Sequence, residues 1–172
     1  MNEFVKALVC DERNSLIPED KDYFGRLIGE WDIEWKDHLG SKEERCVKGE
    51  WIFSRVLEGM GIQDLFICPS REARKKLSVP DAEYGTTIRT YNPSTGFWEV
   101  YYCCYGENTR LEAVKEEDRI VLTEREYGTM KWIFSELEED SFHWQNKQLI
   151  DGNWNLCCDC HAVRRKEAAA IQ

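Results

Sequence analysis

Gly29-Glu30-Trp31-Asp32-Ile33-Glu34-Trp35 is the stretch that decides the fold, because apolar and acidic residues alternate along it. Successive side chains of a β-strand point to opposite faces of the sheet. Trp31, Ile33 and Trp35 therefore share one face, and the three acidic residues share the other. A strand with one dry and one wet face suits a sheet that is curled around an interior.

Nine further segments downstream have extended character, and compact turns such as Asn92-Pro93-Ser94-Thr95-Gly96 and Asp151-Gly152-Asn153 separate the later ones. These candidate strands cover residues 45–57, 62–68, 86–91, 97–105, 110–115, 119–125, 129–137, 141–149 and 154–164. No long crossover joins any late pair, so neighbouring strands must pair antiparallel. Closing the sheet removes its two edges. We therefore predict an all-β fold, a single antiparallel up-and-down β-barrel of about ten strands.

The chain divides into three parts around this barrel. Residues 1–28 lack the alternation, and Tyr23, Phe24, Leu27 and Ile28 follow Pro18 at helical spacing, which predicts an N-terminal extension with a short helix. Residues 29–165 form the predicted β-barrel domain, and residues 166–172 form a charged, Ala-rich, flexible tail.

The longest connection between candidate strands, residues 70–83, is basic. It carries Arg71, Arg74, Lys75 and Lys76 at helical spacing. This pattern is compatible with a basic lid helix, but it is more typical of a solvated helical turn over one end of the barrel.

Composition limits the partners and the location. A chain of 172 residues with 42% hydrophobic residues is long enough for one domain with a sizeable core. The formal net charge of −10 repels phosphate backbones and anionic lipid, so nucleic acid and membrane are poor partners. We see no signal-peptide core and no spanning apolar run, so we expect a cytoplasmic protein whose eight cysteines stay reduced.

Aromatic residues are too numerous for one small core. A barrel interior lined by Trp and Tyr is apolar and still offers N–H and O–H donors, as small-molecule pockets usually do. The alternative is that the rings fill the interior or cap its ends. The candidate ligand-binding aromatic residues are Trp35, Trp51, Tyr91, Trp98, Tyr102, Trp132 and Trp144.

Two charged residues could lie among these rings. Asp64 alternates with apolar neighbours, and Arg89 shares a strand face with Tyr91. An inward-facing Arg is costly unless it is paired. We therefore hypothesise an interior Asp64–Arg89 pair, with Arg55 as the competing partner, that could orient a carboxylate or carbonyl ligand. A register shift of one residue would instead place both side chains on the outer face.

The sequence gives little evidence for a metal site or for a catalytic site. Cys157-Cys158-Asp159-Cys160-His161 contains metal-binding residue types, but on a strand Cys158 and Cys160 point away from the other three. The histidines have no nucleophile at a recognisable spacing, and no Gly-rich phosphate loop occurs. We predict no metal and no cofactor, and we assign no reaction.

Several short motifs resemble a known family. Gly29-Glu30-Trp31 looks like the Gly-x-Trp signature of lipocalins and the wider calycin barrels. The further motifs are Gly49-Glu50-Trp51, Leu57-Glu58-Gly59, Ile62-Gln63-Asp64, Gly85 to Pro93, Gly96-Phe97-Trp98 and Asp151-Gly152-Asn153-Trp154. Together they are similar to the uncharacterised calycin-like bacterial family DUF1579. The resemblance implies a barrel of the lipocalin or fatty-acid-binding type, without an established activity.

In lipocalins an Arg covers the first-strand Trp at the end of the barrel. Arg164 or Arg165, at the end of the last strand, looks like that partner for Trp31. The resemblance therefore implies a structural, barrel-closing role for these residues.

The leading hypothesis is a barrel that binds a small hydrophobic or amphipathic ligand in its interior. A second hypothesis is a small enzyme of the isomerase or cyclase type that uses the polar pair in the cavity, since one architecture hosts many functions. A third is a filled barrel that serves as an interaction scaffold, with a homodimer as the candidate assembly.

Overall fold

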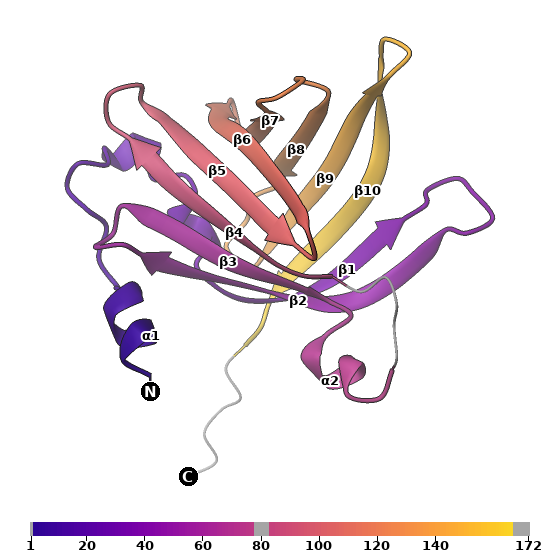
Figure 1. Cartoon of the computed structure of the whole chain (residues 1–172), viewed down its shortest axis with the longest axis horizontal. Coiled ribbons are helices and arrows are strands. Elements are labelled where there is room, and N and C mark those ends of the chain that lie inside the picture. The colour runs from indigo at the N-terminus through magenta and orange to yellow at the C-terminus, as the bar shows by residue number, and fades with distance from the viewer. Residues whose placement is uncertain (1, 78–82, 167–172) are drawn as a thin grey trace.

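The computed structural model describes residues 2–77 and 83–166, and within them ten antiparallel strands form one closed barrel (Figure 1). This confirms the predicted fold class. The strands are β1 (Gly29–Asp37), β2 (Arg45–Val56), β3 (Gly61–Cys68), β4 (Glu83–Asn92), β5 (Phe97–Cys104), β6 (Glu107–Glu116), β7 (Arg119–Glu124), β8 (Met130–Ser135), β9 (Ser141–Ile150) and β10 (Asn153–Arg164).

Each strand pairs with its neighbour in sequence, and β1 pairs with β10 to close the barrel. In that closing ladder Trp31 lies opposite Arg164 and Trp35 lies opposite Cys160. The up-and-down order predicted from the short turns is thus the observed topology. Closure leaves neither β1 nor β10 as a free edge.

The alternation of the first strand holds in three dimensions. Trp31 and Ile33 are buried, whereas Glu30, Asp32 and Glu34 are exposed. On β4 the inward row begins at Glu83, at one end of the barrel, and ends at Tyr91 near the other. Because β4 places residues of odd number inside, Arg89 also faces the interior, and it is completely buried.

The predicted N-terminal helix is instead two short 3-10 turns, η1 (Glu19–Lys21) and η2 (Gly25–Leu27). Between them Asp22 receives two hydrogen bonds from Arg55, at 3.2 and 2.8 Å. A Cβ atom on Gly25 would lie 2.5 Å from an oxygen of Asp22, so the chain turns tightly around this ion pair. Helical spacing alone could not reveal that tertiary contact.

The same N-terminal segment fills one end of the barrel, which we call the closed end. Ile17, Tyr23, Phe24 and Leu27 are buried there among the inward residues of the strands. The Tyr23 hydroxyl donates to the carbonyl of Ala113 at 3.0 Å, and this contact anchors the segment to β6.

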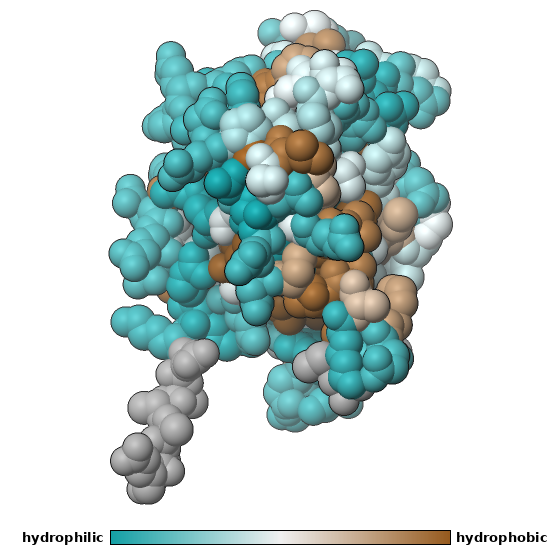
Figure 2. Space-filling view, turned by 90° about the vertical axis from the view of Figure 1, so that its left-hand side faces the viewer, coloured by the Kyte–Doolittle hydropathy of each residue, from teal (hydrophilic) through white to brown (hydrophobic). Residues whose placement is uncertain are grey.

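A helix that the sequence did not predict, α1 (Glu3–Leu8), lies outside the barrel (Figure 1). The chain that follows it runs along the end of β2, where the Leu57 amide donates to the Leu8 carbonyl and the Cys10 amide donates to the Arg55 carbonyl, both at 3.1 Å. Figure 2 shows apolar surface on this side of the molecule. The exposed large apolar residues of these segments are Phe4, Val5, Val9, Leu16 and Leu57.

The basic connection contains a short helix, α2 (Arg71–Arg74), in which the Ser70 hydroxyl accepts a hydrogen bond from the Ala73 amide. No residue of α2 is buried. None of the helices in the described ranges is long and apolar enough to cross a membrane. The predicted tail from residue 167 onward lies outside the described residues.

Candidate functional site

The other end of the barrel encloses a cavity of about 190 Å³, which we call the tryptophan cavity. Its walls come from nine of the ten strands, all except β7. The lining residues are Trp35, Trp51, Phe66, Glu83, Thr87, Tyr102, Glu107, Thr109, Met130, Trp132, Trp144, Asn146, Gln148 and Cys158.

The aromatic walls form a connected set of tilted and edge-to-face rings. The centroid of Trp144 lies 6.1 Å from that of Trp35 and 5.8 Å from that of Trp132. Tyr102 meets Trp132 edge to face at 5.3 Å, and Trp51 meets Trp144 at 5.9 Å. Such contacts stabilise each ring in one orientation. The cavity therefore has walls of closely packed rings.

The indole N–H groups distinguish this cavity from the packed core. At the closed end Trp31 donates to the Leu27 carbonyl and Trp98 donates to the Lys21 carbonyl, both at 2.8 Å. In the cavity, the buried indole nitrogens that have no hydrogen-bond partner within the described chain belong to Trp35, Trp51, Trp132 and Trp144. A buried N–H without a partner costs about 1 to 3 kcal/mol, so their clustering around one space is a functional signal.

A polar acceptor joins these donors. The Asn146 side-chain oxygen is buried and also has no partner in the described residues. Asn146 lies opposite Trp132 across the β8–β9 pair and lines the same cavity. The tryptophan cavity therefore presents unpaired donors together with an unpaired acceptor.

Glu83 and Tyr102 form a hydrogen-bonded pair in the cavity wall. The Tyr102 hydroxyl donates to Oε2 of Glu83 at 2.9 Å. Burial raises the pKa of Glu83 above its usual value of 4.5, and the nearby Glu107 and Asp37 carboxylates add to this rise. The Tyr102 bond and the Arg45 guanidinium oppose it. Burial likewise raises the pKa of Tyr102, so its hydroxyl keeps its proton.

Gly85 makes room for this pair. A Cβ atom on Gly85 would lie 2.8 Å from the Tyr102 ring. The missing side chain thus lets Tyr102 lie against β4 with its hydroxyl next to Glu83.

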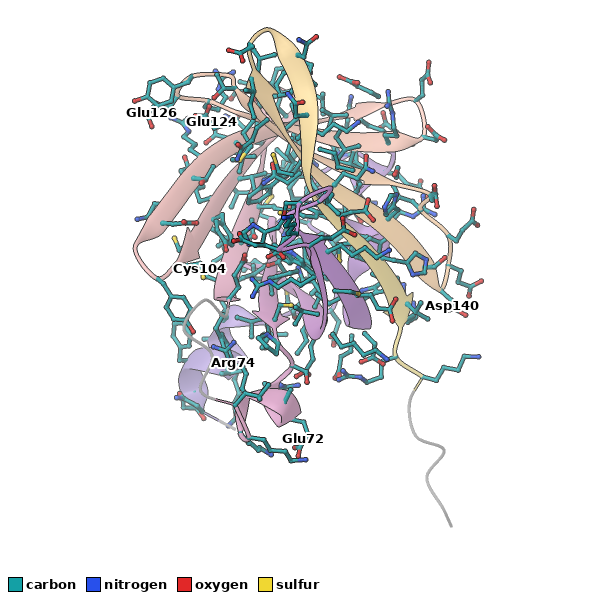
Figure 3. The ribbon with its side chains drawn as sticks, turned by 90° about the vertical axis from the view of Figure 1, so that its right-hand side faces the viewer. Glu72, Arg74, Cys104, Glu124, Glu126 and Asp140 are labelled. Carbon is teal, nitrogen blue, oxygen red and sulfur yellow. The ribbon has the colours of Figure 1, made fainter. Side chains whose placement is uncertain are left out.

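The mouth of the barrel continues the cavity. A second pocket of about 210 Å³ shares Trp35 and Glu83 with it and is also lined by Asp37, Arg45 and Leu77. Beside this pocket, Arg74 of α2 donates to the Glu83 carbonyl at 3.0 Å and to the Tyr105 hydroxyl at 2.7 Å. Figure 3 shows Arg74 below the Cys104 end of β5. The helical turn therefore borders the mouth.

Five of the predicted ligand-binding residues line the tryptophan cavity: Trp35, Trp51, Tyr102, Trp132 and Trp144. The other four, Asp64, Arg89, Tyr91 and Trp98, lie outside its lining. Tyr91 and Trp98 pack against each other at 5.7 Å toward the closed end. The N-terminal segment packs against them there, with the rings of Tyr23 and Phe24 at 6.2 and 5.3 Å from that of Trp98.

Asp64 and Arg89 form the interior pair that the sequence suggested. Nη2 of Arg89 lies 2.6 Å from Oδ2 of Asp64, and both side chains are fully buried. The Thr87 amide donates to the second Asp64 oxygen at 3.1 Å. The guanidinium also lies over the rings of Phe24 and Phe53, at 5.1 and 5.4 Å. The competing residue, Arg55, pairs with Asp22 instead.

Arg164, and not Arg165, covers Trp31. Its guanidinium carbon lies 4.1 Å from the centre of the indole ring. It also donates to the carbonyls of Ile28 at 2.8 Å and Glu139 at 2.9 Å. Arg165 turns outward to Glu30, Asp32 and Glu50.

Sequence reasoning missed Glu83, Thr87 and Asn146 as cavity residues. The signal for Glu83 was present, because residues 83, 85, 87, 89 and 91 share one face of an extended strand. The predicted strand began at residue 86, whereas β4 begins at Glu83. Asn146 follows Phe142 and Trp144 at the same spacing on β9.

The cysteine-rich run divides between two faces, as the alternation predicted. Cys158 lines the tryptophan cavity and Cys160 is fully buried, whereas His161 is exposed. Burial raises the pKa of Cys158 to about 12, so this thiol stays protonated. Among the described residues, no group of three or more His, Cys, Asp or Glu side chains could hold a metal ion.

No family model matches the chain, and no curated protein does. Solved structures do resemble it. Rv2717c from M. tuberculosis superposes with a TM-score of 0.59 at 9% identity, over 90% of this chain and 100% of that one. The S-type phycobiliprotein lyase CPES from Guillardia theta superposes with a TM-score of 0.61 at 12% identity, over 89% and 96%. At these identities the likeness shows the fold alone, a closed antiparallel barrel of ten strands.

Proposed function

We propose that this protein binds a small, planar, amphipathic molecule in the tryptophan cavity. The observation that carries the proposal is the set of four buried indole N–H groups without partners around one space. A ligand with carbonyl or carboxylate oxygens would accept hydrogen bonds from them, while the rings would cover its apolar faces.

The volume of the cavity limits the size of the ligand. A cavity of about 190 Å³ is smaller than the roughly 300 to 1,000 Å³ of pockets for drug-sized ligands. A compact ligand of roughly ten non-hydrogen atoms, about the volume of six water molecules, fits this space. A longer ligand would have to extend into the adjoining pocket at the mouth, beside Trp35 and Glu83.

Asp64 and Arg89 receive a structural role in this proposal. They form an ion pair in the packed core and do not line the cavity. The ligand would instead make its polar contacts with the indole N–H groups, Asn146 and Glu83. Membership of the DUF1579 family, the cytoplasmic location and a homodimer stay predictions.

The test is a titration with indanone, a planar ketone of suitable size, followed by tryptophan fluorescence and isothermal calorimetry. Trp132→Phe and Trp144→Phe each remove one cavity N–H and keep an aromatic ring. We expect each variant to bind about fivefold to tenfold more weakly, since one hydrogen bond contributes about 1 kcal/mol.

The matched control is Trp154→Phe, because Trp154 is 40% exposed on β10 and does not line the cavity. It should bind indanone like the unmodified protein. Equal affinity in all variants, or no binding by the unmodified protein, would contradict the proposal.

A further inference from the structure

Glu83 adds a carboxylate, a hydrogen-bond acceptor, to the lining of the tryptophan cavity. This acceptor affects which kind of ligand the cavity can bind. It is the acidic member of the inward row on β4, and the Tyr102 hydroxyl is bonded to its Oε2 atom at 2.9 Å. Its side chain lines the cavity on the β4 wall. A tyrosine that donates to one carboxylate oxygen leaves the other oxygen able to accept a hydrogen bond.

The cavity thus holds acceptors as well as the four unpaired indole donors. The second acceptor is the unpaired Asn146 oxygen on β9. A ligand with oxygen acceptors alone would satisfy the indole N–H groups, but it would leave the buried Asn146 oxygen without a donor and would make no hydrogen bond to the second Glu83 oxygen. Leaving buried polar groups unpaired disfavours such a ligand relative to one that also carries an N–H.

The basic side chains near Glu83 in the described part of the chain make hydrogen bonds to other groups. Arg45 is engaged with Asp37 at the mouth, where Nε of Arg45 lies 2.8 Å from Oδ1 of Asp37. Arg74 contacts the backbone carbonyl of Glu83 and not its carboxylate. Glu107 also lines the cavity, and it is a further acceptor.

We infer that the ligand class is a planar lactam or cyclic imide, a heterocycle whose ring N–H donates to the Glu83 carboxylate while its carbonyl accepts from the indole N–H groups. This inference rests on the proposed function and deepens it. A lactam carries its donor and acceptor on adjacent ring atoms, so a molecule small enough for this cavity can present both. Its flat faces match the aromatic walls formed by Trp35, Trp132 and Trp144.

The test uses four probes of nearly equal size. Oxindole carries the N–H and the carbonyl, indanone carries the carbonyl alone, indole carries the N–H alone, and indane carries neither. On the unmodified protein we expect oxindole to bind about tenfold more tightly than indanone, which corresponds to ~1.4 kcal/mol. N-methyloxindole, which lacks the N–H, should lose that advantage. This comparison needs no variant.

The matching variant is Glu83→Gln. In it the Tyr102 hydroxyl would bond to the amide oxygen, so the amide NH₂ would face the cavity and oppose a ligand N–H. We expect the preference for oxindole over indanone to disappear. Glu72→Gln on exposed α2 is the control and should keep the preference. Circular dichroism and thermal unfolding check that each variant is folded.

The outcomes separate the two proposals. If oxindole and indanone bind equally well, or if Glu107→Gln and not Glu83→Gln abolishes the preference, this inference is wrong and the proposed function stands. If none of the four probes binds, the proposed function fails and the inference fails with it.

Discussion

At the scale of single residues, the Asp64–Arg89 pair shows how a charged group is tolerated inside this barrel. Both side chains are fully buried, and the guanidinium lies over aromatic rings. Moving two charges out of water is costly, and the mutual attraction offsets that cost only while both partners are present. The pair is therefore sensitive to the loss of either member.

Asp64→Asn should lower the free energy of unfolding by about 3 to 5 kcal/mol, because it leaves the buried Arg89 charge without its partner. Urea unfolding followed by fluorescence measures this change. The double variant Asp64→Leu with Arg89→Met should recover much of the loss. The exposed pair Glu72–Lys75 is the control, and Glu72→Gln should cost less than about 1 kcal/mol. A double variant less stable than Asp64→Asn would contradict this account.

Glu83 predicts a dependence of stability on pH. Burial raises its pKa in the folded protein above the usual value of 4.5. A group whose pKa is raised on folding contributes stability that is fully present below the unfolded pKa and is lost as the pH rises through the folded pKa. Relative to Glu83→Gln, the unmodified protein should therefore lose stability as the pH rises from about 4.5.

Urea unfolding of both proteins between roughly pH 4 and pH 8, at constant ionic strength, measures the difference. The other carboxylates are common to both proteins, so their titration largely cancels. A constant difference over this range would show that Glu83 titrates normally in the fold.

At the scale of elements, the contact of β1 with β10 closes the barrel. Trp31 begins the inward row of β1, and Arg164 of β10 lies over its ring while donating to carbonyls from two other segments. Gly29 has a φ of +129°, which side chains rarely adopt, and a Cβ atom there would lie 2.6 Å from Nη1 of Arg164, which would have to move. These residues therefore connect the N-terminal segment, β1 and β10.

Trp31→Ala should lower the free energy of unfolding by about 3 to 5 kcal/mol, as truncation of a large buried aromatic residue does. It should leave the preference among indanone, oxindole and indane unchanged, because Trp31 does not line the tryptophan cavity. Urea unfolding and calorimetry measure the two effects. Trp154→Ala, at an exposed position, should cost about 0.5 kcal/mol. Altered ligand preference at unchanged stability would place Trp31 in the binding site.

At the scale of the whole molecule, the two ends of the barrel have different roles. The N-terminal segment fills the closed end, where Trp31 and Trp98 donate to its carbonyls. The other end keeps its indole N–H groups unpaired around a cavity. The packed closed end and the lining of the cavity therefore belong to different halves of one core, and we expect variants of the two sets to affect stability and the proposed ligand binding separately.

The sequence pattern predicted the barrel fold and part of its inner face. Alternation along residues 29–35 and the short turns after Tyr84 predicted an antiparallel barrel, because side-chain direction and loop length constrain strand pairing locally. The same alternation predicted that Trp35, Trp132 and Trp144 belong to the inner face. Glu83 was missed because the predicted strand started three residues late.

By itself, the sequence determined the fold class, the order of the strands and the inward face of β1, since these depend on spacing between near neighbours in the chain. Only the tertiary structure decided which inward residues meet a ligand-sized space. That depends on where the N-terminal segment lies, and an ion pair between Asp22 and Arg55, 33 residues apart, helps to hold it at the closed end. Because that segment supplies carbonyls at one end only, it leaves the four indole N–H groups of the other end without partners.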